Sequence, residues 1–140
     1  TDIQQIWTPV LGLAQTDSLL TDAIWPGRDG HLKELRKFGL NCESEKIDIV
    51  TSQVIANKEA LLVKIQPSKY HSAEVEGMDL RGTVGLIIAA AIAEGKSTIE
   101  TPSYALRGYP NLVYNLQNIG IDVQASAEGE DIELLPYYEA

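Results

Sequence analysis

The spacing of hydrophobic side chains divides the chain into helical and extended segments. Apolar residues that recur every three or four positions predict helices, because such residues lie on one side of a helix. Gly39 and Gly120 follow two of these patterns, and glycine in that place commonly ends a helix. In the last helix, Leu112, Leu116 and Ile119 are expected to face inward. Helices are predicted over residues 3–14, 28–38, 80–93 and 106–118.

The first helical pattern contains features that both favour and oppose a helix. Its apolar side includes Ile3 and Trp7, which are expected to be buried. Thr1 or Asp2 is the expected N-cap, since either side chain can accept a hydrogen bond from the first turn. Pro9 opposes the helix, because proline in mid-helix removes a hydrogen bond and bends the rod.

The third helical pattern is apolar on almost every side, which predicts a helix buried all round. It contains Gly82 and Gly85, which cost a helix roughly 1 kcal/mol each relative to alanine. Their presence predicts that a neighbouring element approaches this helix closely.

Short apolar runs bounded by glycine, proline or polar residues indicate strands between the helices. Residues 40–43 and 46–51 are expected to form one hairpin, and residues 121–125 and 131–135 another. Because strands and helices alternate, the sequence predicts an α/β domain with helices packed against sheet. Further strands are predicted over residues 18–25, 61–65 and 97–100, with 73–75 leading into the third helix.

The order of elements occurs twice. Each copy reads helix, strand, helix, strand, strand, over about residues 1–55 and 60–136. We expect residues 1–140 to form a single domain of two repeated βαβαββ-type units, and a third unit to lie outside this chain, since two units leave open edges. Corresponding positions are Asp2 and Asp79, Arg28 and Arg107, and residues 38–40 and 119–121.

The repeated charged residues are the candidate functional residues. Arg28 and Arg107 are each expected just before a helix, where free backbone N–H groups favour an anion. A guanidinium adds a two-pronged donor for carboxylate or phosphate, although an ordinary surface ion pair is the alternative role. Asp2 and Asp79 are each either a helix N-cap or a general base toward a hydroxyl.

Composition excludes several classes of protein. The formal net charge of -9 argues against a nucleic-acid-binding surface, although a local basic pocket remains possible. Cys42 is the only cysteine, so no internal disulfide forms, which fits a reducing cytoplasm, and its strand pattern predicts a core position. No apolar run reaches the ~20 residues of a membrane span. His31 and His71 lack metal-ligand spacing and are interpreted as surface or hydrogen-bonded residues, so neither metal nor cofactor is expected.

Several short motifs together resemble the enolpyruvyl transferases. The resemblance covers roughly residues 1–52 and 76–125 and is strongest to the branch that modifies UDP-N-acetylglucosamine in peptidoglycan synthesis. The motifs are TDIQQ at residues 1–5, Arg28 followed by His31, DLR at 79–81, IAEG at 92–95 and LRGY at 106–109.

The resemblance implies a two-domain enzyme that closes on its substrates. Each domain would be an inside-out α/β barrel of three units, and this chain would supply the last two units of the C-terminal domain. The implied reaction transfers the enolpyruvyl group of phosphoenolpyruvate to the 3-hydroxyl of the UDP-sugar and releases phosphate. The N-terminal domain would carry further catalytic groups, so the chain alone is expected to be inactive. Neither membrane nor nucleic acid is an implied partner.

The resemblance also implies residue roles. Asp2 would take the proton of the sugar hydroxyl, and Arg107 would hold phosphoenolpyruvate; these are the expected catalytic residues. The arginines of the substrate-binding set would be cations of the cleft, and Ile24 would line the sugar-nucleotide pocket. The expected substrate-binding residues are Ile24, Arg28, Asp79 and Arg81.

Some positions depart from the family pattern. Pro110 stands where the family has a glutamate, and Asp29 stands where it has an aromatic residue. The connection over residues 53–78 is also longer than usual. These differences leave two alternatives open: a divergent enolpyruvyl transferase with a shikimate-type or natural-product acceptor, or a non-catalytic binding or scaffold module.

Overall fold

The structure, a computed structural model, describes residues 1–50, 57–125 and 131–135. Helices and strands alternate along the chain, as predicted. No helix in these ranges is long and apolar enough to cross a membrane. In chain order the elements are α1 (Gln4–Leu11), β1 (Ser18–Asp22), α2 (Gly30–Lys37), β2 (Cys42–Val50), β3 (Asn57–Ile65), β4 (Glu74–Glu76), α3 (Leu80–Ile92), β5 (Ser97–Glu100), α4 (Ser103–Gly108), α5 (Leu112–Asn118), β6 (Asp122–Ala125) and β7 (Asp131–Leu135).

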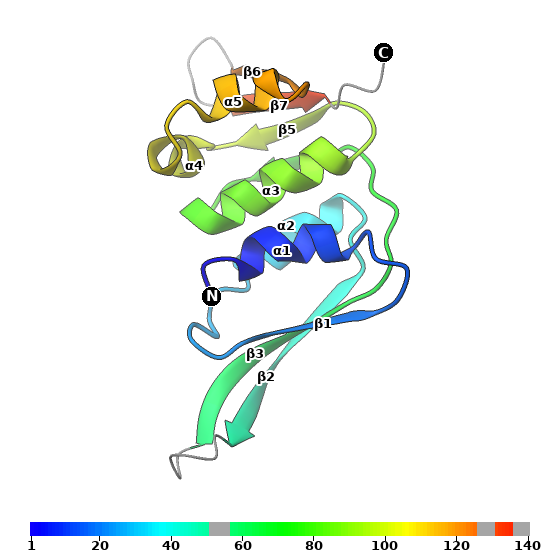
Figure 1. Ribbon diagram of the computed structural model, residues 1–140, viewed down its shortest axis with the longest axis vertical. Coiled ribbons are helices and arrows are strands. Elements are labelled where there is room, and N and C mark those ends of the chain that lie inside the picture. The colour runs from blue at the N-terminus through cyan, green and yellow to red at the C-terminus, as the bar shows by residue number, and fades with distance from the viewer. Residues whose placement is uncertain (51–56, 126–130, 136–140) are drawn as a thin grey trace.

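The described strands form two sheets with helices between them. One sheet is antiparallel with strand order β1-β3-β2. The other has the order β4-β5-β7-β6, in which only β4 and β5 are parallel. Figure 1 shows α1, α2 and α3 in the layer between the two sheets. The strand order β1-β3-β2 of the first half corresponds to the order β5-β7-β6 of the second half, which supports the proposed repeat.

The core lies where α2 and α3 face the sheets. Phe38 and Leu35 are fully buried at the end of α2, and Val63 and Ile65 are fully buried on β3. Cys42 is also buried, as predicted. The helix α3 is buried on most sides, so the prediction from its composition is confirmed.

The helix α1 packs against α3 through an unexpected face. Gln5 and Thr8 are fully buried, whereas Ile3 is 61% exposed and Trp7 48% exposed. The predicted inward side of this helix is therefore wrong for the described chain. A Cβ atom on Gly85 would collide with the carbonyl oxygen of Gln5, which explains the close helix contact and confirms the role predicted for this glycine.

The N-cap predicted for α1 is also wrong. Ile3 occupies the cap position with helical backbone angles, and no side chain caps the helix. Pro9 is accommodated inside α1. Asp2 lies one residue further out and pairs instead with Arg28.

Two predicted elements have different boundaries. The expected hairpin of residues 40–43 and 46–51 is a single strand, β2, which pairs over its whole length with β3. The expected helix of residues 106–118 is divided into α4 and α5, because Asn111 adopts a left-handed conformation with φ 59° directly after Pro110. Ile119, expected inside, is 74% exposed.

Other boundaries agree more closely. The strand β5 has the predicted bounds, and Gly39, Gly95 and Gly120 all have positive φ after a helix. The strand β1 ends at Asp22, earlier than expected, because its carboxylate accepts hydrogen bonds from the next loop. Residue 51 of the predicted strand 46–51 and the ends of the two predicted repeats, at residues 55 and 136, lie outside the described residues.

Candidate active site

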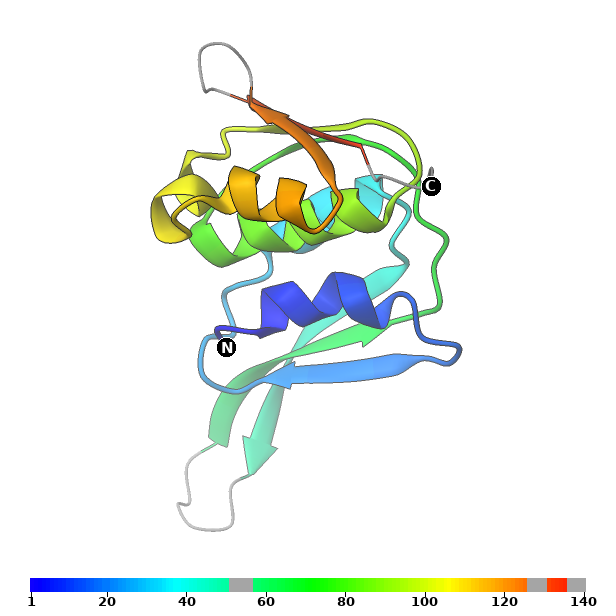
Figure 2. The ribbon, with the colours of Figure 1, turned by 45° about the horizontal axis from the view of Figure 1, so that its top comes forward.

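A cleft of about 390 Å³ lies where α1, α2 and α3 begin. These helices come from both halves of the chain, and Figure 2 shows their packing from a second direction. Because the three helix starts lie together, charged residues far apart in sequence share one surface. The cleft is lined by Asp2, Arg28, Asp79, Leu80 and Arg81.

Asp2 and Arg28 form an ion pair at one side of the cleft. Their Oδ1 and Nη1 atoms are 3.2 Å apart, and the Asp2 side chain is 68% exposed. Arg28 also stacks on Trp25, with its guanidinium carbon 5.0 Å from the ring centroid. Asp2 is thus held in place by a cation but stays open to a ligand, which suits a carboxylate that accepts a proton from a bound hydroxyl.

The loop that carries Trp25 is fixed by Asp22. This carboxylate accepts hydrogen bonds from the backbone N–H groups of Ile24 and Trp25, each at 3.0 Å. Burial disfavours its charged form, but the Thr1 side chain together with these backbone N–H groups outweighs burial and lowers the pKa of Asp22. The buried carboxylate therefore holds the loop on which Arg28 rests.

Asp79 has a structural position. Its Oδ1 accepts a hydrogen bond of 2.8 Å from the backbone N–H of Gly82, which makes it the N-cap of α3. The side-chain amide of Gln5 also approaches this oxygen, at 3.4 Å. The cap role, one of the two predicted alternatives, is thus realised at Asp79, although this residue also lines the cleft.

Arg81 lies in the first turn of α3 and is partly buried. Its Nη1 donates a hydrogen bond to the hydroxyl of Tyr109, and its guanidinium carbon lies 5.6 Å from the centre of that ring. Within the described ranges the structure gives Arg81 no carboxylate partner, in contrast to Arg28. Its charge is therefore available to an anionic ligand in the cleft.

Two predicted site residues do not line the cleft. Arg107 stacks on Tyr104 at 5.4 Å, and its Nε donates to the carbonyl of Ser103 at 3.3 Å. It lies in the last turn of α4, so the expectation that it precedes a helix is wrong. Ile24 is 65% exposed and is not part of the cleft lining.

His31 was predicted at the surface or hydrogen-bonded, and this prediction is wrong. The side chain is 2% exposed, and neither ring nitrogen has a partner within the described residues. Burial lowers the pKa of His31 to about 4, against the opposing effect of Asp79 and Asp29. His71, by contrast, is exposed, with its Nδ1 3.1 Å from the carbonyl of Ser72, as expected.

Sequence reasoning missed the aromatic partners of the arginines. Trp25 precedes Arg28 by three residues, and Tyr104 precedes Arg107 by the same distance. This repeated spacing was the signal that could have identified both rings. Tyr109 lies in the LRGY motif, but no spacing in the sequence pairs it with Arg81, because the two residues meet only through the fold.

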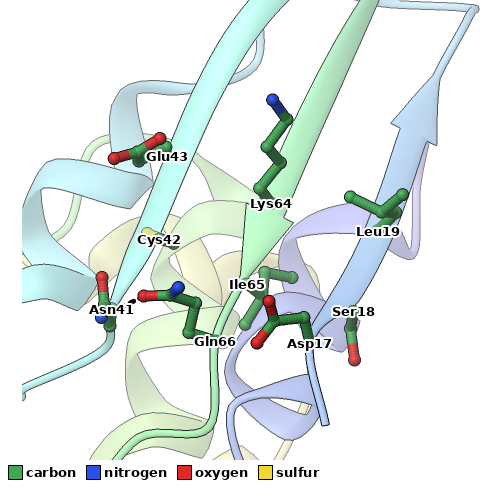
Figure 3. Close-up of a pocket in the computed structure, with 9 residues that line it drawn as sticks. All are labelled: Asp17, Ser18, Leu19, Asn41, Cys42, Glu43, Lys64, Ile65 and Gln66. Carbon is green, nitrogen blue, oxygen red and sulfur yellow. Dashed lines mark hydrogen bonds between the residues drawn. The ribbon is translucent and has the colours of Figure 1, made fainter.

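A second pocket, of about 150 Å³, lies at one end of the three-stranded sheet (Figure 3). Three of its polar side chains already have partners: Lys64 pairs with Glu45 at 3.3 Å, and the amide of Asn41 donates to Gln66. Burial raises the pKa of the Cys42 thiol, which disfavours the reactive thiolate. This pocket therefore offers less chemistry than the cleft. No cluster of acidic, histidine and cysteine side chains in the described residues suits a metal ion.

The geometry defines an α/β domain that presents arginines and an open carboxylate at converging helix starts. The sequence profile of EPSP synthase (3-phosphoshikimate 1-carboxyvinyltransferase) matches residues 18–116. The chain therefore belongs to this family, the enolpyruvyl transferases.

A relative with a similar sequence agrees with this assignment. The chain is 40% identical over 123 residues to UDP-N-acetylglucosamine 1-carboxyvinyltransferase 2 of Staphylococcus aureus (strain Mu50), a match that covers 88% of this chain and 26% of that protein. The chain thus spans about a quarter of that relative's length.

Solved structures share the fold. The enolpyruvyl transferase NikO from Streptomyces tendae matches with a TM-score of 0.69 and 22% identity, covering 97% of this chain and 27% of that one. EPSP synthase from Acinetobacter baumannii matches with a TM-score of 0.64 and 19% identity, covering 96% and 28%. The predicted α/β fold of the enolpyruvyl transferase type is confirmed.

Proposed function

We propose that this chain is part of an enzyme that transfers the enolpyruvyl group of phosphoenolpyruvate to the 3-hydroxyl of UDP-N-acetylglucosamine. The observation that carries the proposal is the pairing of Asp2 with Arg28 in a cleft that also holds Arg81. The name of the 40% identical relative supports this choice of acceptor. Transfer of the same group to another acceptor is the alternative.

Asp2 would accept the proton of the attacking sugar hydroxyl. The adjacent guanidinium of Arg28 holds and orients the carboxylate, while the exposure of Asp2 leaves room for the sugar. Addition of the hydroxyl to phosphoenolpyruvate would give a tetrahedral intermediate, from which phosphate then leaves.

Arg81 and Arg107 would bind the charges of phosphoenolpyruvate. Its carboxylate and phosphate call for several guanidinium donors, which also stabilise negative charge that develops during the reaction. Arg81 already lines the cleft, whereas Arg107 reaches the ligand only after it leaves Tyr104. Ile24 would contact the nucleotide sugar at the edge of the cleft, and Asp79 would hold the start of α3 in place.

Exposed apolar side chains on α1 and next to its two ends support the proposal that a further unit completes this domain. Ile3, Trp7 and Leu13 are all between 48% and 61% exposed, although α1 lies beside the core. A third α/β unit packed here would bury them, as α1 itself helps to bury α3. The remaining domain of the protein would then form the opposite wall of the cleft.

The test uses the full-length protein that contains this chain. Phosphate release is measured with phosphoenolpyruvate and UDP-N-acetylglucosamine, and separately with 3-phosphoshikimate as acceptor. We expect release only with the UDP-sugar. Release only with 3-phosphoshikimate would replace the acceptor, and failure to bind either substrate in calorimetry would overturn the enzymatic proposal in favour of a non-catalytic module.

A further inference from the structure

Each arginine of the candidate site lies against one aromatic ring. The distances from guanidinium carbon to ring centroid are 5.0 Å for Arg28, 5.6 Å for Arg81 and 5.4 Å for Arg107. Such stacking holds a guanidinium in one plane and leaves its edge free for hydrogen bonds. The three pairs differ in what else holds the arginine.

Arg81 alone among these three is also hydrogen-bonded by its own ring partner. The Tyr109 hydroxyl accepts from Nη1 of Arg81, so the phenol fixes both the plane and the rotation of the guanidinium. A neutral phenol orients the cation without cancelling its charge, whereas Asp2 pairs Arg28 with an opposite charge. Arg81 is thus both fixed and uncompensated.

The segment that carries Tyr109 packs against the start of α3. A Cβ atom on Gly108 would collide with the side chain of Leu80, so the end of α4 rests directly on the residue before Arg81. The backbone N–H of Tyr109 donates to the carbonyl of Ala105 at 2.9 Å, which closes the last turn of α4. The ring is therefore placed by the backbone joint at Gly108.

We propose that Tyr109 is a positioning residue that presents the Arg81 guanidinium to the carboxylate or phosphate of phosphoenolpyruvate. The inference rests on the proposed function. Tyr109 itself touches no substrate in this proposal and acts through Arg81. Tyr109 follows Arg107 by two residues, so the contact of Gly108 with Leu80 brings the backbone of this segment to the start of α3. An uncharged residue would thus contribute to phosphoenolpyruvate binding through Arg81.

The test compares two substitutions in the full-length protein. Tyr109→Phe keeps the ring and removes the hydroxyl, and we expect the KM for phosphoenolpyruvate to rise about tenfold, the effect of losing one hydrogen bond to a charged group. Tyr109→Leu also removes the stacked ring and should raise this KM further. The KM for the sugar nucleotide should stay unchanged, because Asp2 and Arg28 are untouched.

A double-mutant cycle shows whether the effect passes through Arg81. Arg81→Lys removes the planar donor, so adding Tyr109→Phe to that variant should change phosphoenolpyruvate binding by less than twofold. Equal effects of Tyr109→Phe in both backgrounds would contradict the proposal. Tyr114→Phe, at a 64% exposed tyrosine on α5, is the matched control and should leave both KM values unchanged.

The failure of this inference differs from failure of the proposed function. A wild-type protein that releases no phosphate with any acceptor overturns the function. An active wild type in which Tyr109→Phe and Tyr109→Leu both keep the normal KM for phosphoenolpyruvate overturns only the role of Tyr109. A uniform rise in both KM values would mark Tyr109 as a general structural residue and equally overturn the proposal.

Discussion

Asp2 and Asp79 occupy corresponding places in the two halves of the chain, yet they do different work. Asp79 has extended backbone angles, φ -150° and ψ 171°, and caps α3. In the first half, Ile3 takes the cap position with φ -108° and ψ -10°, so Asp2 lies outside the helix. The comparison shows that a shift of one residue in a helix start releases a carboxylate from a structural role.

The helices that follow these aspartates differ in a complementary way. The helix α1 carries Gln5 and Thr8 three and six residues after Asp2. The helix α3 carries Gly82 and Gly85 three and six residues after Asp79. Both polar side chains are buried. Gly85 leaves room for the backbone of Gln5 on α1, whereas Gly82 leaves room for the side chains of Asp79 and His31. The two copies fit together because they are unequal.

The largest expected effect is a loss of turnover when Asp2, the aspartate outside the helix, is substituted. In the full-length protein, Asp2→Asn should lower kcat by about 10²- to 10⁴-fold, the usual contribution of a general base, while substrate binding persists. Steady-state phosphate release measures this. Asp17→Asn, at an exposed aspartate outside the cleft, is the matched control and should keep normal turnover. A normal kcat for Asp2→Asn would remove Asp2 from the reaction.

The second prediction concerns the pH dependence of stability that His31 causes. The corresponding position in the second half, three residues after Arg107, is Pro110, which does not titrate. The folded pKa of about 4 lies below the ordinary value of 6.5, so the unfolded chain binds the proton more tightly. Stability should therefore fall as pH decreases from about 6.5 to 4, by roughly 3 kcal/mol in total.

Urea unfolding of the full-length protein between pH 7 and 4 measures this loss. His31→Gln should flatten the dependence in this window, whereas His71→Gln, at an exposed histidine, should leave it unchanged. From about pH 4.5 downward, protonation of Glu34 and then Asp22 also lowers stability, because the pKa values of both carboxyls are lowered in the folded chain. A wild-type slope in His31→Gln would contradict the prediction.

The sequence predicted those parts of the fold that depend on local pattern. The buried helix α3 and the strand β5 were found because an apolar run and its flanking glycine are local signals. The inward side of α1 was missed, because periodicity identifies the apolar face and not the face that α3 covers. The division between α4 and α5 depends on the backbone at Asn111, which the helical spacing concealed.

The candidate site was predictable to a similar degree. Four of the six expected residues lie together in the cleft: Asp2, Arg28, Asp79 and Arg81. They could be predicted because the internal repeat and the family motifs contain them. Tyr109 was missed because its contact with Arg81 joins elements 28 residues apart. Their roles in binding and catalysis stay predictions.

The third prediction sharpens the unequal fit of the helices. Gly85→Ala should destabilise the protein by about 1–3 kcal/mol, because the added methyl group meets the backbone of Gln5 and neither helix can yield alone. Thermal and urea unfolding measure the loss. Gly27→Ala, where nothing lies within 4 Å of the added atom, should change stability by less than about 0.5 kcal/mol. Equal stabilities would show that α1 and α3 separate easily.

The smallest expected effect returns to the two aspartates. Asp79→Ala should cost about 1 kcal/mol of stability, because the backbone N–H of Gly82 loses its acceptor at the start of α3. Asp2→Ala should cost much less, since its ion pair is largely exposed and such pairs contribute little. Urea midpoints of the two variants give the difference directly. If the two substitutions were equally destabilising, the aspartates would share one structural role, and the division between a capping and a reactive carboxylate would be lost.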